Sequence, residues 1–589
     1  MQGFIPIQMV NAELKFCVFI IAASTIVGII WIRVHLAARV IAIGKSISTF
    51  GIIFLSSVFI SSLFAHNFER ALVSSFTWHV LPVFLGFSLI QLKWTTGRLH
   101  GFISLLLLGG LLSCLVVMDQ HYLWTDWSHR LPRAGYGGLI YNQNFAAEYH
   151  APLLPLALSL VFLIKSKLLR FIFFGSLLFV FLPALSLSLA RGAWVGLMGG
   201  SFITGCLFIL LLLKSGKMIT AGSRKKLLGI SFSFILLSIT LPIYLLSSDL
   251  WKKDSFSEKS SATHIQSSEE ALELKSIVTI NQASGGSGRR IVLWKDALEA
   301  VMSKYFLLGR GTDHYELHFH ESAKRSDQTT GSMLVRFTHN DFLQILYENG
   351  IVGLIGFLGL WIAILREGLK RALAHASEKN LSNVTLILGL VASCLTFLIE
   401  SFFEFPTRSP CAMIVGWSTL GLLLVLSRQK SGNLKPPEII MIGPKCNLFI
   451  GALAVWIIPF GWLLSKNLFW TNIYHFQGRI AGDYGQKDQS LRFHRKSIEY
   501  APWEHHSRKF ECYYLLSHKK QFPEALEAIN QTLAMHPGCL VAYQNKIAIS
   551  INEFKDYDMA KEAYFDMKRV APYHPFTKQE GQKLSQLKP

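Results

Sequence analysis

Charged residues are scarce in this chain of 589 residues. Only 16% are Asp, Glu, Lys or Arg, against about 25% in an ordinary soluble domain. Hydrophobic residues make up 51% of the chain. This composition excludes a string of soluble domains. Acidic residues are the scarcer charged kind, with 37 Asp and Glu against 57 Lys and Arg, which gives a net charge of +20.

Cysteine motifs and a cleavable leader are also lacking. The eight cysteines are scattered, without a C-x-x-C pair or the spacing of metal ligands, so we expect no structural zinc or other metal site. The first apolar run has neither a basic segment before it nor an A-x-A-like cleavage site after it. We therefore interpret it as a retained membrane helix.

Long apolar runs dominate what is present. About twelve runs approach the length of roughly 20 residues that a helix needs to cross a bilayer. Trp78, His79 and Pro82 interrupt the third run. The pattern predicts an all-α, polytopic membrane helix bundle. The runs are 15–32, 47–65, 72–92, 101–118, 147–164, 168–189, 192–213, 227–246, 349–366, 383–402, 409–427 and 447–466.

The positive charges follow membrane topology rather than a nucleic-acid site. Lys and Arg crowd the short loops 33–45, 93–98, 165–170, 214–226, 366–379 and 428–445. These loops alternate along the chain with short loops that hold few Lys or Arg, which is the positive-inside pattern of membrane proteins. We therefore expect no nucleic-acid partner. The other side, facing outward, then holds 119–146, 190–191, 247–348, 403–408 and everything after 466. Twelve spans place the N-terminus outside as well, and one span more or fewer would reverse that end.

Four regions follow from these patterns: residues 1–246 with eight spans, 247–348 as a large outer loop, 349–466 with four spans, and 467–589 as a polar tail. The first part of the loop, "KKDSFSEKSSATHIQSSEEALELKS", is Ser-rich and is expected to be mobile. The second part, "GRRIVLWKDALEAVMSKYFLLGRG", predicts an amphipathic helix followed by a glycine turn.

The tail contains a repeat. Pro502, Pro537 and Pro572 end three helical patterns and lie 35 residues apart. Ser490, Ala525 and Ala560 occupy matching small positions before them. Small residues there allow paired helices to approach closely, so we predict tetratricopeptide-like helix pairs. Such a tail usually offers a concave surface to a protein partner.

Arg191 lies between two apolar runs, in "LPALSLSLARGAWVGLMGG". A charge so close to hydrocarbon is costly and suggests a functional site. The alternative is an arginine that extends to the membrane interface. Arg290 begins "RIVLW", four residues before Trp294 and on the same helical face. It could lie over the indole or serve only the local structure.

His339 lies in "RFTHNDFLQILYENG", at the mouth of a long apolar helix. Thr338 and Asp341 form a capping-box pattern, which would place His339 in the first helical turn. The helix dipole disfavours a charged imidazole there, and a neutral imidazole suits a general base. The alternative is that Thr338 and Asp341 cap the helix and the histidine is incidental.

Other polar residues stand at the edges of spans. Asn142, Gln143 and Asn144 precede the fifth span, where their amides could bind sugar hydroxyls or cap the helix. Glu400 and Glu404 flank the outer loop "IESFFEFPTRSP", and spacing alone assigns them no role.

Taken in order, these stretches resemble the O-antigen ligase and polymerase family of bacterial inner-membrane glycosyltransferases. The resemblance runs through "NQNFAAEY", "SLARGAWVGL", "GRRIVLWKDAL", "FLLGRGTDHY", "THNDFLQILYENGIVGLIGFL" and "ESFFEFPTRSPCAMIVGW", over most of residues 140–425. The first four spans fit it only by hydropathy, and some relatives carry a tetratricopeptide tail. The resemblance implies a GT-C-like membrane fold.

The resemblance also implies a reaction. A glycan on an undecaprenyl diphosphate carrier would move to an acceptor hydroxyl at the outer face of the cytoplasmic membrane, with inversion and without metal or cofactor. Arg191 and Arg290 would offset the charge of the departing diphosphate. His339 would accept the proton of the attacking hydroxyl. The large loop and the tail would be periplasmic.

We further expect Asn142, Asn144, Arg310 and Asn340 to bind substrate. Two features depart from the family: the cation and acid in "GRGTDHY", Arg310 and Asp313, and the Ser-rich insertion 252–285. The acceptor is open among a glycolipid core, a second repeat unit and a protein Ser or Thr. A transporter fits the span count, but the two halves show no similarity. A scaffold explains the tail but not Arg191 or His339.

Overall fold

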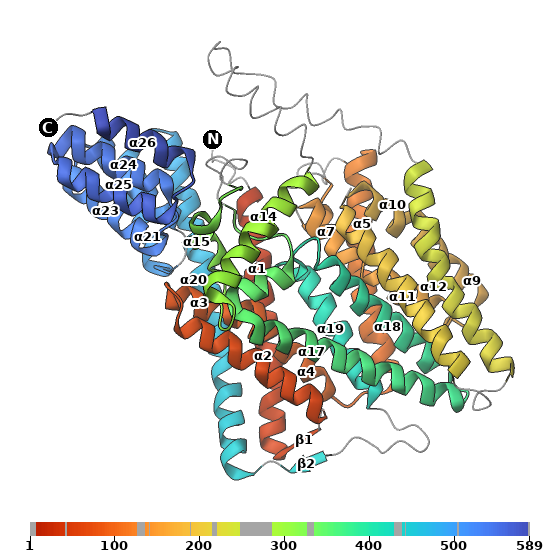
Figure 1. Ribbon diagram of the computed structural model, residues 1–589. Coiled ribbons are helices and arrows are strands. Elements are labelled where there is room, and N and C mark those ends of the chain that lie inside the picture. The colour runs from red at the N-terminus through yellow and green to blue at the C-terminus, as the bar shows by residue number, and fades with distance from the viewer. Residues whose placement is uncertain are drawn as a thin grey trace. The chain divides into compact units, whose positions relative to one another are not determined.

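The computed structural model describes residues 7–41, 44–125, 136–140, 142–188, 190–214, 221–247, 286–326, 335–428, 439–441, 443–503 and 506–586. Of the described residues, 83% are helical, as expected for an all-α membrane bundle (Figure 1). The described strands form one small antiparallel ribbon, in which β1 (Arg39–Ile41) pairs with β2 (Ile439–Met441). The Ser-rich insertion 252–285 lies outside the described residues.

Contacts divide the chain into two units. The membrane unit comprises Met1–Ile52, Thr77–Ser261 and Gly356–Ser465. The second unit, here called the loop–tail unit, comprises Ile53–Phe76, Ala262–Ile355 and Lys466–Pro589. Residues 262–348 of the outer loop and the tail thus fall in the same unit.

The membrane unit is built from apolar helices. It holds α1 (Ile7–Ala37), the first part of α2 (Lys45–Leu63), η1 (Phe76–Val80), α4 (Leu81–Ile90), α5 (Thr96–Tyr122), η2 (Gly138–Ile140), α7 (Gln143–His150), α8 (Leu153–Val161), α9 (Lys167–Ser176), η3 (Leu177–Phe181), α10 (Leu182–Leu187), α11 (Arg191–Lys214), α12 (Ala221–Ser247), most of α17 (Asp341–Ser377), α18 (Leu381–Glu400), η8 (Pro406–Arg408), α19 (Pro410–Ser427) and the start of α20 (Pro444–Asp483).

Ten helices in the described part of the chain are long and apolar enough to cross a membrane. The predicted run 147–164 is not one helix, because α7 ends at His150 and α8 begins at Leu153. Pro152 lies between them and lacks the N–H that a continuous helix would need. Helix α12 covers the predicted run 227–246, although its side chains beyond Ile239 lie outside the described residues.

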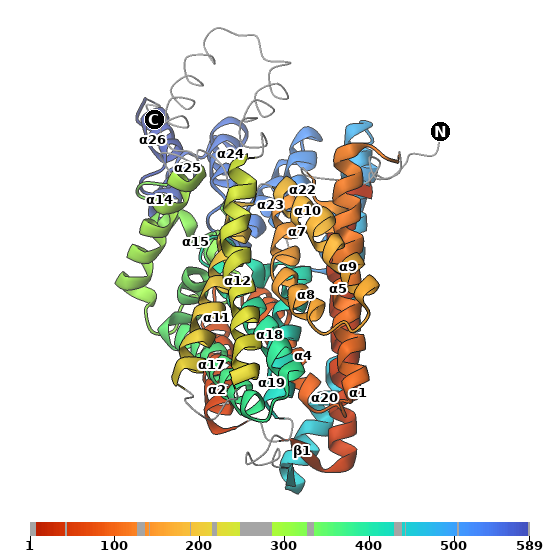
Figure 2. The ribbon, with the colours of Figure 1, turned by 90° about the vertical axis from the view of Figure 1, so that its right-hand side faces the viewer.

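Helices α11 and α18 pack along a stripe of glycines (Figure 2). A Cβ atom on Gly196 would lie 2.8 Å from the carbonyl oxygen of Thr396. One on Gly200 would lie 2.5 Å from the Thr396 nitrogen. Small residues every four positions let two backbones approach closely, which is how helices associate within a membrane. This contact fixes α11, and with it the position of Arg191 at its start.

The loop–tail unit holds the second part of α2, α3 (Phe68–Ser75), α14 (Gly286–Ala300), η7 (Val301–Tyr305), α15 (Tyr315–Ser322), the start of α17, the end of α20, α21 (Lys487–Tyr500), α22 (His506–His518), α23 (Phe522–Met535), α24 (Leu540–Ile549), η9 (Ser550–Phe554), α25 (Tyr557–Val570) and α26 (Pro575–Gln586). Helices α21, α23 and α25 start 35 residues apart. The predicted small residues Ser490, Ala525 and Ala560 are buried. The assignment of tetratricopeptide repeats stays a prediction.

The tail packs against α15 of the outer loop. The ring centroids of His320 and His574 lie 5.2 Å apart. A Cβ atom on Gly538 would lie 2.8 Å from the carbonyl oxygen of Leu317. The tail therefore supports the loop directly, in addition to any partner that it binds.

Candidate functional site

Arg191 is the first residue of α11, and its side chain is exposed. The next residue shows how closely the start of the helix approaches its neighbour. A Cβ atom on Gly192 would lie 3.0 Å from Cγ of Glu404 and 3.1 Å from Cβ of Phe403. The start of α11 is therefore pressed against the loop between α18 and α19. Arg191 lies beside that loop at one end of the membrane unit.

Three charged residues near this loop are buried. Glu400, Glu404 and Arg408 are 0%, 4% and 3% exposed, and the Arg408 guanidinium lies 5.8 Å from the centre of the Trp78 ring. Buried charges are costly unless other groups compensate them. The two glutamates to which spacing assigned no role thus belong to a buried polar cluster beside the start of α11.

Asn142 and Asn144 lie at the start of α7, in the same unit. Asn142 Oδ1 accepts a hydrogen bond from the Asn144 backbone N–H at 2.8 Å, so Asn142 caps the helix. This is the capping role left open by the sequence. Asn144 is half-buried in the first turn. The ring centroids of Phe145 and Phe405 lie 5.7 Å apart, which joins α7 to the same loop that borders Arg191.

His339 lies outside the helix that it precedes. Helix α17 begins at Asp341, and Asn340 caps it: Asn340 Oδ1 accepts the Leu343 N–H at 3.0 Å. The predicted capping by Thr338, with His339 in the first turn, is therefore wrong. Both Thr and Asn can cap a helix, and here the Asn340 amide, two residues after Thr338, does so. The Thr338 hydroxyl instead donates to the Asn340 carbonyl at 2.8 Å.

The backbone of His339 is left-handed, with φ of 54°. Residues other than glycine seldom adopt this conformation, and it persists only where neighbouring contacts enforce it. Those contacts surround Thr338. Its carbonyl accepts the Trp294 indole N–H at 2.8 Å, and its N–H donates to Gln344 Oε1 at 2.8 Å. Gln344 in turn donates to Glu348 Oε1 at 2.6 Å.

Arg290 is tied to this segment through α14. It is half-buried and lies one helical turn before Trp294, the residue whose indole holds Thr338. Helix α14 packs against α15 and α17 through an apolar cluster that includes Leu293, Tyr315 and Leu346. One rigid cluster therefore carries both Arg290 and the His339 segment. The stacking of Arg290 on the indole stays a prediction.

The glycine turn, residues 309–311, lies against the kink of α17. Gly350 has φ of 69° and interrupts the helix. The Arg310 and Gly311 N–H groups donate to the Tyr347 and Glu348 carbonyls at 3.0 and 2.8 Å, and the Ile351 N–H donates to Phe306 at 2.7 Å. These bonds satisfy backbone groups that the kink releases. The turn and the start of α17 thus hold each other in place.

Arg310 is engaged within the protein. Its guanidinium donates to both carboxylate oxygens of Glu321, at 2.8 and 3.2 Å, and lies 4.2 Å from the centre of the Tyr305 ring. Burial raises the pKa of Glu321, but the hydrogen bonds from His318 and Arg310 outweigh it and lower the pKa to about 2. This geometry favours a structural role for Arg310 over substrate contact.

Asp313, which the sequence marked only as a departure from the family, has ionic partners that its sequence position did not reveal. It is 5% exposed and has φ of 62°. Its carboxylate pairs with Arg70 at 3.0 Å and with Arg336 at 3.7 Å. Arg336 is partly exposed and precedes His339 by three residues. The left-handed Asp313 thus links the glycine turn to the segment that carries His339.

The predicted site residues therefore fall into two groups. Arg191, Asn142 and Asn144 belong to one end of the membrane unit, whereas Arg290, Arg310, His339 and Asn340 belong to the loop–tail unit. The described residues contain no group of three or more His, Cys, Asp or Glu side chains that could hold a metal ion.

Comparison with known proteins matches residues 174–358 to a family model described as O-antigen ligase. No curated protein is significantly similar to the chain. The match begins in α9 and ends in α17, so it includes Arg191, Arg290 and His339. Asn142, Asn144 and the loop 401–409 lie outside it.

Proposed function

We propose that the chain transfers a glycan from undecaprenyl diphosphate to an acceptor hydroxyl. Residues 174–358 match the model of the O-antigen ligase family, which supports this proposal. The reaction takes place at the outer face of a bacterial cytoplasmic membrane, where the large loop and the tail are periplasmic. The membrane spans and the family match support this assignment.

In the proposed reaction the acceptor oxygen attacks the anomeric carbon of the glycan. The bond from that carbon to the phosphate oxygen breaks, and the diphosphate leaves with the electron pair. His339 accepts the proton of the acceptor hydroxyl. This single displacement inverts the anomeric centre, since no covalent glycosyl intermediate forms. We propose that no metal ion takes part, and transfer that persists in EDTA would support this.

The two arginines act on the leaving group. A guanidinium donates two parallel hydrogen bonds to phosphate oxygens and retains its charge at every relevant pH. Arg191 has an exposed side chain at the start of α11, where the helix N-terminus also favours an anion. We propose that Arg191 and Arg290 bind the diphosphate and stabilise the charge that develops on it.

The observation that carries the proposal is the left-handed backbone of His339 inside the matched segment. A helix cap requires only Asn340, which already supplies it. A strained histidine beside a cap that does not need it suggests selection for function rather than for stability. Substrate contacts from Asn144 and Asn340 complete the proposed site.

The acceptor is a lipid A–core glycolipid in a ligase, a second repeat unit in a polymerase, or a protein Ser or Thr in an O-oligosaccharyltransferase. These alternatives share the chemistry and differ in the product. We favour a ligase or a polymerase. The tail packs against α15 and supports the loop, and we propose that its outer surface binds an acceptor or an assembly partner.

Complementation tests the proposal. The gene is deleted and restored as wild type, His339→Ala or Arg191→Ala. His518→Ala and Arg98→Ala serve as controls, since both residues are exposed and lie outside the proposed site. Membrane levels of each protein are measured, and the surface polysaccharide is resolved on a gel.

We expect the two site variants to insert normally but to lose the long glycan, while the lipid-linked precursor accumulates. Single repeats on the acceptor would then indicate a polymerase, and free carrier-linked polymer a ligase. A normal glycan profile in both site variants would contradict the proposal and favour a transporter.

A further inference from the structure

The span Lys167–Leu187, made of α9, η3 and α10, has the least protein around it. Only 22% of its apolar window is buried, the lowest share among the ten candidate spans of the described chain. Helix α9 buries none of its ten residues. Phe171 and Phe179 are 76% and 74% exposed. In a membrane, lipid must cover this surface.

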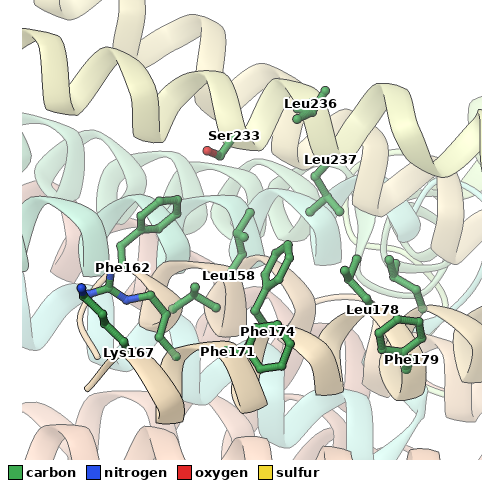
Figure 3. Close-up of a pocket in the computed structure, with 13 residues that line it drawn as sticks. Leu158, Phe162, Lys167, Phe171, Phe174, Leu178, Phe179, Ser233, Leu236 and Leu237 are labelled. Atoms are coloured by element: carbon green, nitrogen blue, oxygen red, sulfur yellow. The ribbon is translucent and has the colours of Figure 1, made fainter. Parts of the chain in front are cut away.

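A groove of about 800 Å³ runs beside this span. Its volume lies within the range of roughly 300–1,000 Å³ that small-molecule sites occupy. Among the residues that line its length, Ser233 is the polar exception between the two ends (Figure 3). The apolar walls include Leu158 from α8, Phe162 just after it, Phe174 and Leu178 from α9 and η3, and Leu236 and Leu237 from α12.

One end of the groove is cationic. Lys167 and Arg170 line it there, and Figure 3 shows Lys167 beside Phe162, at the end opposite Phe179. The Arg170 guanidinium is fixed, because Nε and Nη2 both donate to the Ile164 carbonyl at 3.0 and 2.6 Å. No acidic residue is among the described residues that line the groove. The positive charge of Lys167 and Arg170 therefore complements an anionic headgroup.

The cationic end lies across the membrane from Arg191. The span runs from Lys167 to Leu187, and Arg191 follows at the start of α11. A phosphate at Lys167 thus belongs to a lipid of the leaflet opposite to the one that Arg191 faces. The glycan donor, whose diphosphate is proposed to meet Arg191, does not fit this arrangement.

We propose that this groove binds one anionic glycerophospholipid of that opposite leaflet. An acyl chain lies along the apolar walls, and the phosphate lies between Lys167 and Arg170. The lipid packs against a span that is little covered by protein. Arg191 follows this span in the chain, so the lipid stabilises the segment before it. The site is separate from the proposed transfer reaction and does not depend on it.

Native mass spectrometry of the purified full-length protein tests the site. The probes are palmitoyl-oleoyl phosphatidylglycerol and phosphatidylcholine with the same chains. We expect one tightly held phosphatidylglycerol and at least tenfold weaker phosphatidylcholine. Lys167→Gln/Arg170→Gln should weaken phosphatidylglycerol roughly 30-fold, since each cation near an anionic lipid contributes about a factor of five. Lys225→Gln/Lys445→Gln, which removes two exposed cations that do not line the groove, should leave it unchanged.

A second pair of variants tests the acyl groove. Leu237→Trp fills the groove and should release the lipid, whereas Leu210→Trp, on an exposed part of α11, should not. Equal binding of both phospholipids, or unchanged binding in Lys167→Gln/Arg170→Gln, would overturn the proposal. Displacement by glycerol 3-phosphate alone, or tighter binding of undecaprenyl phosphate than of phosphatidylglycerol, would overturn it as well.

Discussion

Trp294→Phe tests whether the His339 segment must be held in place for transfer. The substitution keeps an aromatic ring in the apolar cluster around α14 and removes one hydrogen-bond donor. The lost bond is the one from the indole N–H to the Thr338 carbonyl, at 2.8 Å. Thr338 is fully buried, so water cannot readily replace the donor.

The size of the effect follows from that burial. Leaving a buried carbonyl without its donor costs about 1–3 kcal/mol. If the chain avoids this cost by moving the segment, the His339 geometry is populated roughly 5- to 150-fold less often. Turnover should fall by that factor. The KM for the donor should change little, because Arg191 is untouched and the phenyl ring keeps an aromatic face on which Arg290 can lie.

The assay is transfer from a purified lipid-linked glycan by the protein in detergent or nanodiscs. Trp94→Phe is the matched control, since its indole N–H also donates to a backbone carbonyl, that of Leu89 at 2.6 Å. Both variants should lose thermal stability, and only Trp294→Phe should lose turnover. Equal turnover in the two variants would refute the reasoning.

Three further predictions follow from the loop–tail unit. Gly350→Ala should abolish folding, because its Cβ atom would lie 2.2 Å from a backbone oxygen, whereas Gly175→Ala, with open space around it, should give a normal size-exclusion profile. The pKa of Glu321 is about 2 in the folded chain against an ordinary 4.5; its stabilisation is therefore present above about pH 4.5 and is lost as the pH falls toward 2. Melting temperatures of Glu321→Gln should decline less over that interval, and an identical decline would contradict this. Gly538→Val should separate the tail from α15, detected as faster hydrogen exchange in Leu317 and its neighbours, and unchanged protection would contradict the contact.

Most of the membrane spans were predictable from the sequence, because their cause is local. A run near 20 apolar residues is required wherever a helix crosses the bilayer, whatever its neighbours are. The predicted run 383–402 corresponds to α18 at Leu381–Glu400, and 192–213 to the span Arg191–Leu213. The run 147–164 was wrong because hydropathy does not register that Pro152 breaks the hydrogen bonds of a helix.

The local geometry around His339 was not predictable from the sequence, although the residue types that begin the helix were visible in it. Thr338, Asn340 and Asp341 all suit a helix start, so spacing could not identify Asn340 as the cap. The left-handed backbone of His339 has no sequence signal, since it is imposed by contacts around Thr338. The pairing of Asp313 with Arg70 joins residues 243 positions apart. By contrast, the Gln344–Glu348 bond has an i, i+4 spacing that sequence reasoning could have found.

The role of His339 as general base is the central claim, and the rate of transfer by His339→Ala tests it most directly. The measurement uses purified protein, a saturating polyprenyl-diphosphate-linked glycan and a defined acceptor, with His518→Ala as the control. The account predicts a loss of roughly 100- to 10,000-fold in turnover, the usual contribution of general base catalysis, with donor binding retained. A rate within about threefold of the wild type would show that His339 does not accept the proton and would contradict the account.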